Sequence, residues 1–207
     1  MKKTKRPAAR KAAGKKKKPV MRHGREGMKA RSKRAAKPGA ARPRAAGLKR
    51  QYLDIFTKEF PTTLKVMKAY PSGQGDFKPH ERSYSASQLV HSFAQENSLV
   101  VQAIRGELKM PPDFAPAPAT YAEAVANYER GARELIAAVE KMPESRLFET
   151  VTFITGPGQM GQVPVSDILW IMLMDSIHHR GQLSVYVRMA GGKVPSIYGP
   201  SADEPWM

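Results

Sequence analysis

The sequence predicts an all-α protein: a four-helix bundle with a long crossover before the last helix, preceded by a disordered basic tail. Two observations support this prediction. In four separate segments, apolar residues recur at spacings of three and four, which is the periodicity of a helix with one buried face. The charges are also unevenly divided, since residues 1–50 hold 21 of the 35 Lys and Arg residues but one of the 18 acidic residues. We therefore divide the chain into a tail, 1–50, and a folded domain, 51–207.

The tail carries a net charge of +20 and none of the 16 aromatic residues of the chain. Such a segment buries too little apolar surface to offset the entropy lost on ordering, so we expect it to be disordered. Its charge favours non-specific binding of nucleic acid through the phosphates. A solvated tail without a partner is the alternative interpretation, and Met21 or Met28 could also be the first translated residue.

The first predicted helix runs from about Leu48 to Ala69. Pro61 lies in its middle, where the proline ring removes a backbone hydrogen bond, so we expect a kink or a break there. Residues 71–75 combine Pro, Ser and two Gly residues, which predicts a loop.

Two capping boxes mark the starts of the second and third helices. Ser85 with Gln88, and Thr120 with Glu123, each place a hydroxyl residue three positions before a Gln or Glu. We expect the second helix to end near residue 108, before a linker rich in Pro and Ala, and the third helix to end near residue 142.

The connection before the last helix has a different character. Residues 148–154 are β-prone and lead into a turn at 155–158, which predicts a short hairpin-like segment. The fourth helix follows from about 165 to 189 and is apolar nearly all round in its first half, so we expect other helices to surround it. Residues 156–161 match the G-x-G-x-x-G pattern, but Pro164 separates them from the helix, so we expect no dinucleotide site.

Polar residues inside the apolar fourth helix are the leading candidates for a functional site. Asp175 and His179 lie four positions apart and therefore share one helix face. Burying a carboxylate and an imidazole costs several kcal/mol unless they are paired or bound to a metal. On the second helix, His91 lies between the apolar residues Leu89 and Phe93. Because facing helices of a bundle bring inward ligands together, His91, Asp175 and His179 form a candidate site for Zn²⁺, Ni²⁺, Fe²⁺ or Mn²⁺.

The same residues allow a simpler interpretation without a metal. Asp175 and His179 would then hydrogen-bond to each other, and His91 would be a core histidine. His178 is rotated by about 100° from His179 around the helix, so we do not expect it to join the site.

Three stretches of the sequence follow a pattern known from one family. They are residues 85–91, residues 178–183 with the Arg188, Gly191 and Gly192 that follow, and residues 194–200. Together they resemble the DinB/YfiT superfamily of four-helix-bundle metalloenzymes, which is named for induction by DNA damage. The resemblance implies His91 and His179 as metal ligands and a third ligand at Asp175, where the family usually has a histidine. The tail has no counterpart in this pattern.

The resemblance implies metal-dependent transfer of a low-molecular-weight thiol, or hydrolysis or isomerisation of a small molecule. A bound divalent transition metal would supply the nucleophile, by lowering the pKa of a water or a thiol, in a chain that has no cysteine. Gln182, Tyr186 and Tyr198 are candidates for orienting the substrate. The competing hypothesis is a non-catalytic, dimeric damage-response protein whose tail binds DNA.

We also expect a homodimer, because Trp170, Met174 and Ile177 are apolar and lie off the proposed ligand face. The longest apolar run, residues 168–174, is far too short to span a bilayer, and the basic N-terminus is not followed by the apolar stretch of a secretory signal. With the absence of cysteine, these features lead us to expect a cytoplasmic protein without a membrane partner.

Overall fold

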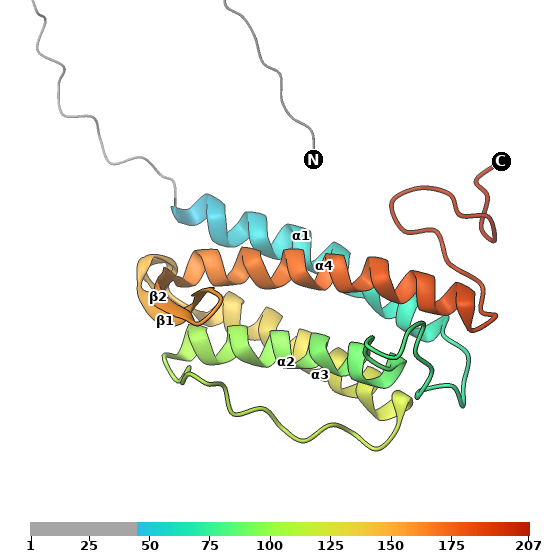
Figure 1. Cartoon of the computed structure of the whole chain (residues 1–207). Coiled ribbons are helices and arrows are strands. Elements are labelled where there is room, and N and C mark those ends of the chain that lie inside the picture. The colour runs from blue at the N-terminus through green and yellow to red at the C-terminus, as the bar shows by residue number, and fades with distance from the viewer. Residues whose placement is uncertain (1–44) are drawn as a thin grey trace, which may run out of the picture. The chain divides into compact units, whose positions relative to one another are not determined.

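The structure is a computed structural model that describes residues 45–207. It contains the four helices α1 (Ala45–Lys68), α2 (Ala86–Arg105), α3 (Tyr121–Lys141) and α4 (Val165–Met189). α1 packs against α3 and α4, and α2 packs against the same two helices, so that the four helices enclose one core. The segment between α2 and α3 follows the length of the bundle, so these two helices run in the same direction (Figure 1). The predicted all-α four-helix fold is confirmed.

The folded domain begins earlier than predicted. Residues 45–50, assigned to the tail from their composition, form the first turns of α1. Lys49 Nζ donates hydrogen bonds of 2.8 Å to the carbonyl oxygens of Glu140 and Met142, at the end of α3. These carbonyls lack partners within their own helix, so a lysine there stabilises the helix end. The rest of the predicted tail, residues 1–44, lies outside the described residues.

Pro61 does not break α1, contrary to the expected interruption. The helix continues through it to Lys68. Pro61 and Thr57, whose carbonyl loses its amide donor, are both exposed, so water can reach the freed oxygen.

Both capping boxes form as predicted. Ser85 accepts from the Gln88 amide while the Gln88 side chain accepts from the Ser85 amide, and Thr120 and Glu123 do the same at the start of α3. α2 ends slightly before the predicted residue 108, because Gly106 takes a left-handed conformation with φ 77° and terminates the helix.

The connection before α4 contains the predicted hairpin. A short 3-10 helix, η1 (Glu144–Phe148), precedes the antiparallel strands β1 (Thr150–Gly156) and β2 (Gln159–Pro164). The glycine-rich pattern at 156–161 therefore forms the turn of this hairpin and the start of β2, and it opens no helix.

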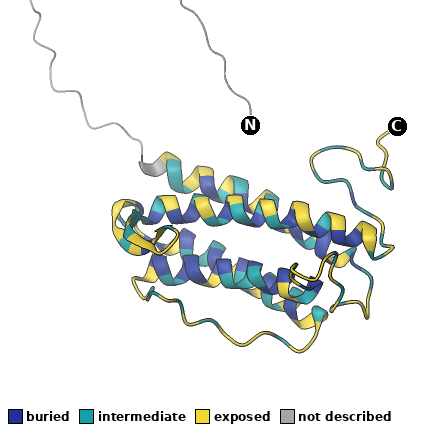
Figure 2. Ribbon diagram, in the orientation of Figure 1, coloured by how far each residue is buried: buried dark blue, intermediate teal, exposed yellow. Residues whose placement is uncertain are grey.

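The core lies between the helices, where Figure 2 shows the buried faces turned toward one another. Among the buried polar side chains of this core is Arg180 on α4, which is only 1% exposed. Its guanidinium donates to Glu59 at 2.6 Å and to Thr63 at 3.2 Å, both on α1, and also to the Tyr198 hydroxyl. A buried charge needs such partners, so this pair fixes α4 against α1. No helix within residues 45–207 is long and apolar enough to cross a membrane.

The apolar surface of α4 only partly matches the face predicted for a homodimer. Trp170 and Ile177 pack against the core. The Trp170 ring meets the Tyr52 ring edge-on, with 5.6 Å between the ring centroids. Met174, however, is 59% exposed, and Ile171, Val185 and Met189 are exposed on the same helix. Burying this row of apolar side chains in a second copy remains our expectation.

The first prediction concerns the domain boundary. A protein of residues 45–207 should melt within about 2 °C of the full chain, because α1 is complete. Residues 51–207 should melt several degrees lower, since each Lys49 hydrogen bond contributes about 1 kcal/mol and that shifts Tm by roughly 2–4 °C in a domain of this size. Equal melting temperatures for the two fragments in calorimetry would contradict the boundary.

The second prediction concerns the homodimer. Light scattering at micromolar concentration should give the mass of two chains, and Met174→Glu with Val185→Glu should give one, because charges would be placed in the apolar interface. Tyr84→Glu is the matched control. Tyr84 is exposed and lies off this row, so this change should leave the dimer intact. A wild-type monomer would disprove this expectation.

Candidate metal centre

The centre of the candidate site is a carboxylate that the sequence analysis did not select. Glu96 lies on the face of α2 that packs against α4, and it is only 7% exposed. Its Oε2 accepts a hydrogen bond from the Ser176 hydroxyl, and its Oε1 lies 2.8 Å from Nδ1 of His179. Two residues of α4 therefore hold one buried carboxylate of α2.

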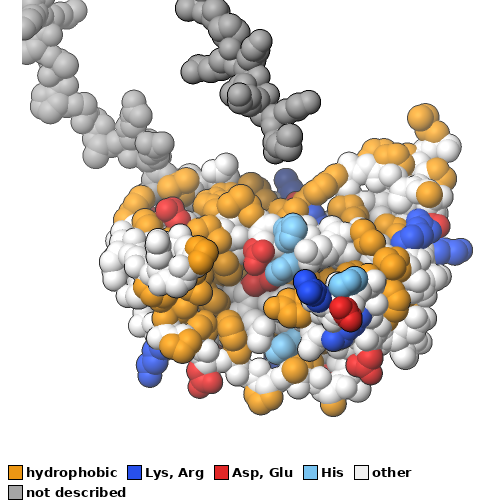
Figure 3. All heavy atoms as spheres, viewed as in Figure 1, with side chains coloured by type: hydrophobic (Ala, Val, Ile, Leu, Met, Phe, Trp, Pro, Cys, Tyr) orange, Lys and Arg blue, Asp and Glu red, His pale blue; other side chains and the backbone are white. Residues whose placement is uncertain are grey.

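Asp175 completes the cluster on its solvent side. Its Oδ1 lies 3.9 Å from Nε2 of His179, one turn further along α4, and its side chain is 44% exposed. Glu96, Asp175 and His179 each offer one ligand atom within 4.8 Å of the others. Near the middle of the face in Figure 3, acidic side chains adjoin histidine side chains at the surface. The cluster is thus anchored in the core and open on one side.

The electrostatics of the cluster favour a cation between its carboxylates. Burial raises the pKa of Glu96, and the charge of Asp175 adds to the increase, while the hydrogen bonds from His179 and Ser176 oppose it. The hydrogen bond to Glu96 raises the pKa of His179 by more than burial lowers it. A proton on His179 therefore balances the two neighbouring acids, and a divalent ion would balance them in the same way.

The donor set and its spacing fit a divalent metal ion. Carboxylate oxygen and imidazole nitrogen are ligands of Zn²⁺, Fe²⁺ and Mn²⁺. Two ligand atoms on one ion lie roughly 3 Å apart, and the 2.8 Å between Glu96 Oε1 and His179 Nδ1 is close to this value. Asp175 Oδ1 lies 3.9 Å from the other ring nitrogen, Nε2, and because one ion binds only one nitrogen of an imidazole, metal binding requires the ring or a carboxylate to shift.

The structure does not bring His91 to this cluster. His91 precedes Glu96 by five residues, which is a rotation of roughly 140° around α2. It lines a cavity of about 300 Å³ together with Asn127 and Gly131 of α3. Its two ring nitrogens are buried and have no hydrogen-bond partner among residues 45–207. Of the three ligands predicted from the sequence, Asp175 and His179 lie together, and Glu96 occupies the place expected for His91.

A signal for Glu96 was present in the sequence. Leu89, Phe93, Glu96 and Val100 recur at the helical spacing of three and four and form one buried face. An acidic residue on that face needs a partner as much as the buried histidine does.

The residues predicted to orient a substrate each bond elsewhere. Gln182 pairs with the exposed His178 at 2.9 Å, and the Tyr186 hydroxyl donates to the Tyr84 carbonyl at 3.0 Å. The Tyr198 hydroxyl donates to Glu59 at 2.8 Å and accepts from Arg180. The two tyrosine contacts fasten the loop before α2 and the C-terminal segment to the bundle. His178 is exposed and is not part of the cluster.

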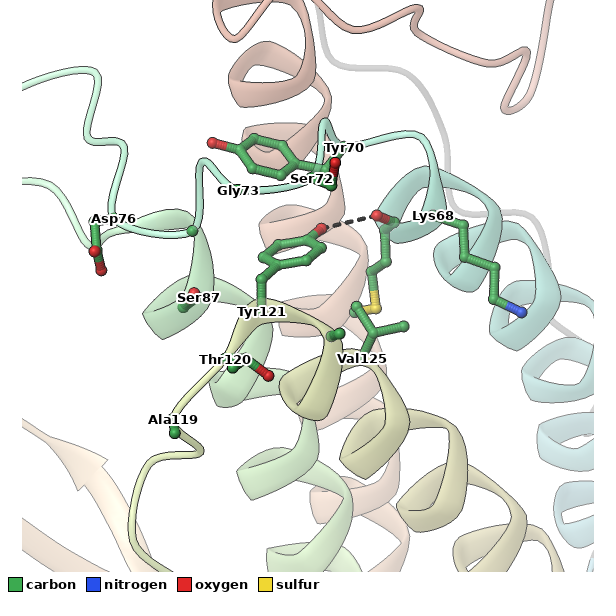
Figure 4. Close-up of a pocket in the computed structure, with 13 residues that line it drawn as sticks. Lys68, Tyr70, Ser72, Gly73, Asp76, Ser87, Ala119, Thr120, Tyr121 and Val125 are labelled. Atoms are coloured by element: carbon green, nitrogen blue, oxygen red, sulfur yellow. Dashed lines mark hydrogen bonds between the residues drawn. The ribbon is translucent and has the colours of Figure 1, made fainter.

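A separate cavity of about 540 Å³ lies where the end of α1 meets the starts of α2 and α3 (Figure 4). The rings of its aromatic residues Tyr70 and Tyr121 stack, with 4.8 Å between the ring centroids. Their hydroxyls donate to the carbonyls of Gln74 and Met67, each at 2.8 Å. None of the three clustered ligand residues lines this cavity, so its size alone does not make it the candidate site.

The bundle, with a donor cluster between α2 and α4 that could hold a metal ion, defines a class of four-helix proteins with a candidate metal centre. The sequence profile of the DinB family matches residues 44–206, so the chain belongs to the DinB family.

Individual proteins resemble this chain in sequence or in fold. The uncharacterized protein YrdA of Bacillus subtilis (strain 168) is 32% identical over 95 residues, which is 45% of this chain and 54% of YrdA. The matched region thus spans about half the length of that relative. Two solved structures share the fold. The DinB-like protein YjoA of Bacillus subtilis has a TM-score of 0.58 and 21% sequence identity, over 71% of this chain and 97% of YjoA. A DinB-like protein of Bacillus cereus ATCC 10987 has a TM-score of 0.59 and 18% sequence identity, over 71% of this chain and 95% of that protein.

The third prediction tests which face of α2, the one with Glu96 or the one with His91, contributes to metal binding. Glu96→Gln and His179→Ala should each weaken binding of a divalent metal by more than about 100-fold, because even changes behind the ligands cost roughly 10–100-fold. His91→Ala and His178→Ala are the matched controls and should keep the metal. Elemental analysis after reconstitution and dialysis measures this directly. Retention by Glu96→Gln together with loss in His91→Ala would reverse the assignment.

Proposed function

We propose that the protein is a metal-dependent enzyme of the DinB family that acts on a small molecule. Glu96, Asp175 and His179 would hold one divalent transition metal. The observation that carries this proposal is the gathering of their three ligand atoms within 4.8 Å on two facing helices. The exposed side of Asp175 leaves room for a substrate to approach.

The residues of the chain act here mainly by positioning. Ser176 holds Glu96 through one carboxylate oxygen, and Glu96 fixes the His179 ring through Nδ1. The Phe93 ring packs against the His179 imidazole, with 5.8 Å between the ring centroids, and shields that side of the imidazole from water. A metal bound there would lower the pKa of a water or a thiol toward neutrality.

Thiol transfer and hydrolysis are the reaction classes that we favour. The chain has no cysteine, so a thiol would have to come from a cosubstrate. The Ser176 hydroxyl donates to Glu96 and not to an imidazole, so it lacks the Ser–His pair of hydrolases that use a serine nucleophile. An external nucleophile, activated at the metal, is therefore the economical mechanism.

A second candidate function is non-catalytic binding of DNA by a dimer. The net charge of +20 on residues 1–50 favours it, since such a segment binds phosphates without reading sequence. The two functions differ in what they need: the enzyme needs Glu96 and His179, whereas DNA binding needs the basic segment.

The fourth prediction tests the enzyme. Metal-loaded protein should turn over electrophiles with a low-molecular-weight thiol, or hydrolyse small esters or amides, and Glu96→Gln or His179→Ala should reduce kcat/KM by at least about 100-fold. His91→Ala should keep most of the activity. If metal-loaded protein turned over none of these substrates, yet bound DNA with an affinity that fell steeply with salt, the second function would replace the first.

A further inference from the structure

We infer that this centre is built for an oxygen-preferring divalent cation of the Mn²⁺ type, and that Glu96 and Asp175 set this preference. The inference rests on the proposed metal site and concerns which metal the site selects. It follows from the donors, the charge and the open side of the cluster.

The donors at the cluster are mainly oxygens. Glu96 and Asp175 contribute carboxylates, and His179 contributes the single imidazole. The sequence contains no cysteine to add a thiolate, and His91 faces the cavity toward α3 instead. Carboxylate and water ligands suit Mg²⁺ and Mn²⁺, whereas imidazoles suit Zn²⁺ and Ni²⁺. Histidines in place of Glu96 and Asp175 would instead have made a site with nitrogen donors, which suits Zn²⁺ and Ni²⁺.

The charge of the cluster points the same way. Its two carboxylates match the charge of a divalent ion, so the loaded centre would be neutral. Arg180, the neighbour of His179 in sequence, does not offset them, because its guanidinium is committed to Glu59 on α1 at 2.6 Å. A site of three neutral imidazoles would instead leave two positive charges in the bundle.

The geometry leaves room for a coordination number above four. Ser176 occupies Oε2 of Glu96, so this residue presents Oε1 alone toward His179. The side chain of Asp175 is 44% exposed, so water can reach the cluster from solvent and complete the shell. Mn²⁺ takes up octahedral positions with water, while Zn²⁺ in protein sites is most often tetrahedral.

Isothermal titration of the full-length protein with MnCl₂ and with ZnCl₂ tests the inference. The quantity compared is the ratio of the Kd for Mn²⁺ to the Kd for Zn²⁺, because Zn²⁺ binds more tightly than Mn²⁺ to most sites. Asp175→His should raise this ratio by about tenfold or more, since one oxygen donor becomes an imidazole. His178→Ala is the control on the same helix and should leave the ratio within about twofold of the wild type.

The outcomes separate this inference from the proposed function. If both metals bind and Asp175→His leaves the ratio unchanged, the inference is wrong while the metal site stands. If neither metal binds to the wild type, the metal site fails and the inference fails with it. Glu96→Gln gives an independent check, because it should weaken Mn²⁺ more than Zn²⁺; the opposite order would also overturn the preference. Circular dichroism melts confirm that each variant is folded.

Discussion

The burial of Glu96 between α2 and α4 is the constraint on which the candidate site depends. A carboxylate at this depth must be compensated, and removing one partner of a buried ion pair costs roughly 3–5 kcal/mol. His179 and Ser176 supply the compensation from the facing helix. The contact therefore fixes the rotation of α2 relative to α4, and it also gathers three potential metal ligands at one point of the bundle. The contact that joins the two helices thus involves the same atoms as the candidate metal centre.

Three consecutive polar residues of α4 face three different surroundings. His178 is exposed, His179 binds Glu96 of α2, and Arg180 binds Glu59 of α1. Because neighbouring residues are about 100° apart on a helix, three consecutive polar side chains can serve solvent and two different partner helices. This explains how a nearly apolar helix carries several charged groups: each of the buried ones has a partner on a particular neighbour. The Tyr198 hydroxyl then joins the C-terminal segment to the Arg180–Glu59 pair.

The sequence predicted the features that local interactions determine. The capping boxes at Ser85 and Thr120, the hairpin before α4 and the pairing of Asp175 with His179 depend on residues close together in the chain. The α2 residue of the cluster depends instead on which side of α2 faces α4: the sequence analysis selected His91, whereas the structure places Glu96 beside Asp175 and His179. The domain boundary was placed too late, at residue 51, although the helix was predicted from about Leu48, because the contact that holds Lys49 joins it to the end of α3, more than ninety residues away. Composition cannot reveal such a contact.

The position of a bound metal tests this account most directly. Crystals of the full-length protein grown with MnCl₂ should give an anomalous scattering peak between α2 and α4, within about 2.0–2.3 Å of ligand atoms of Glu96, Asp175 and His179. The imidazole of His91 should remain in its separate cavity, away from the ion. A peak coordinated by His91, or a cluster in which Glu96 and His179 stay hydrogen-bonded with no ion beside them at saturating metal, would contradict the central claim.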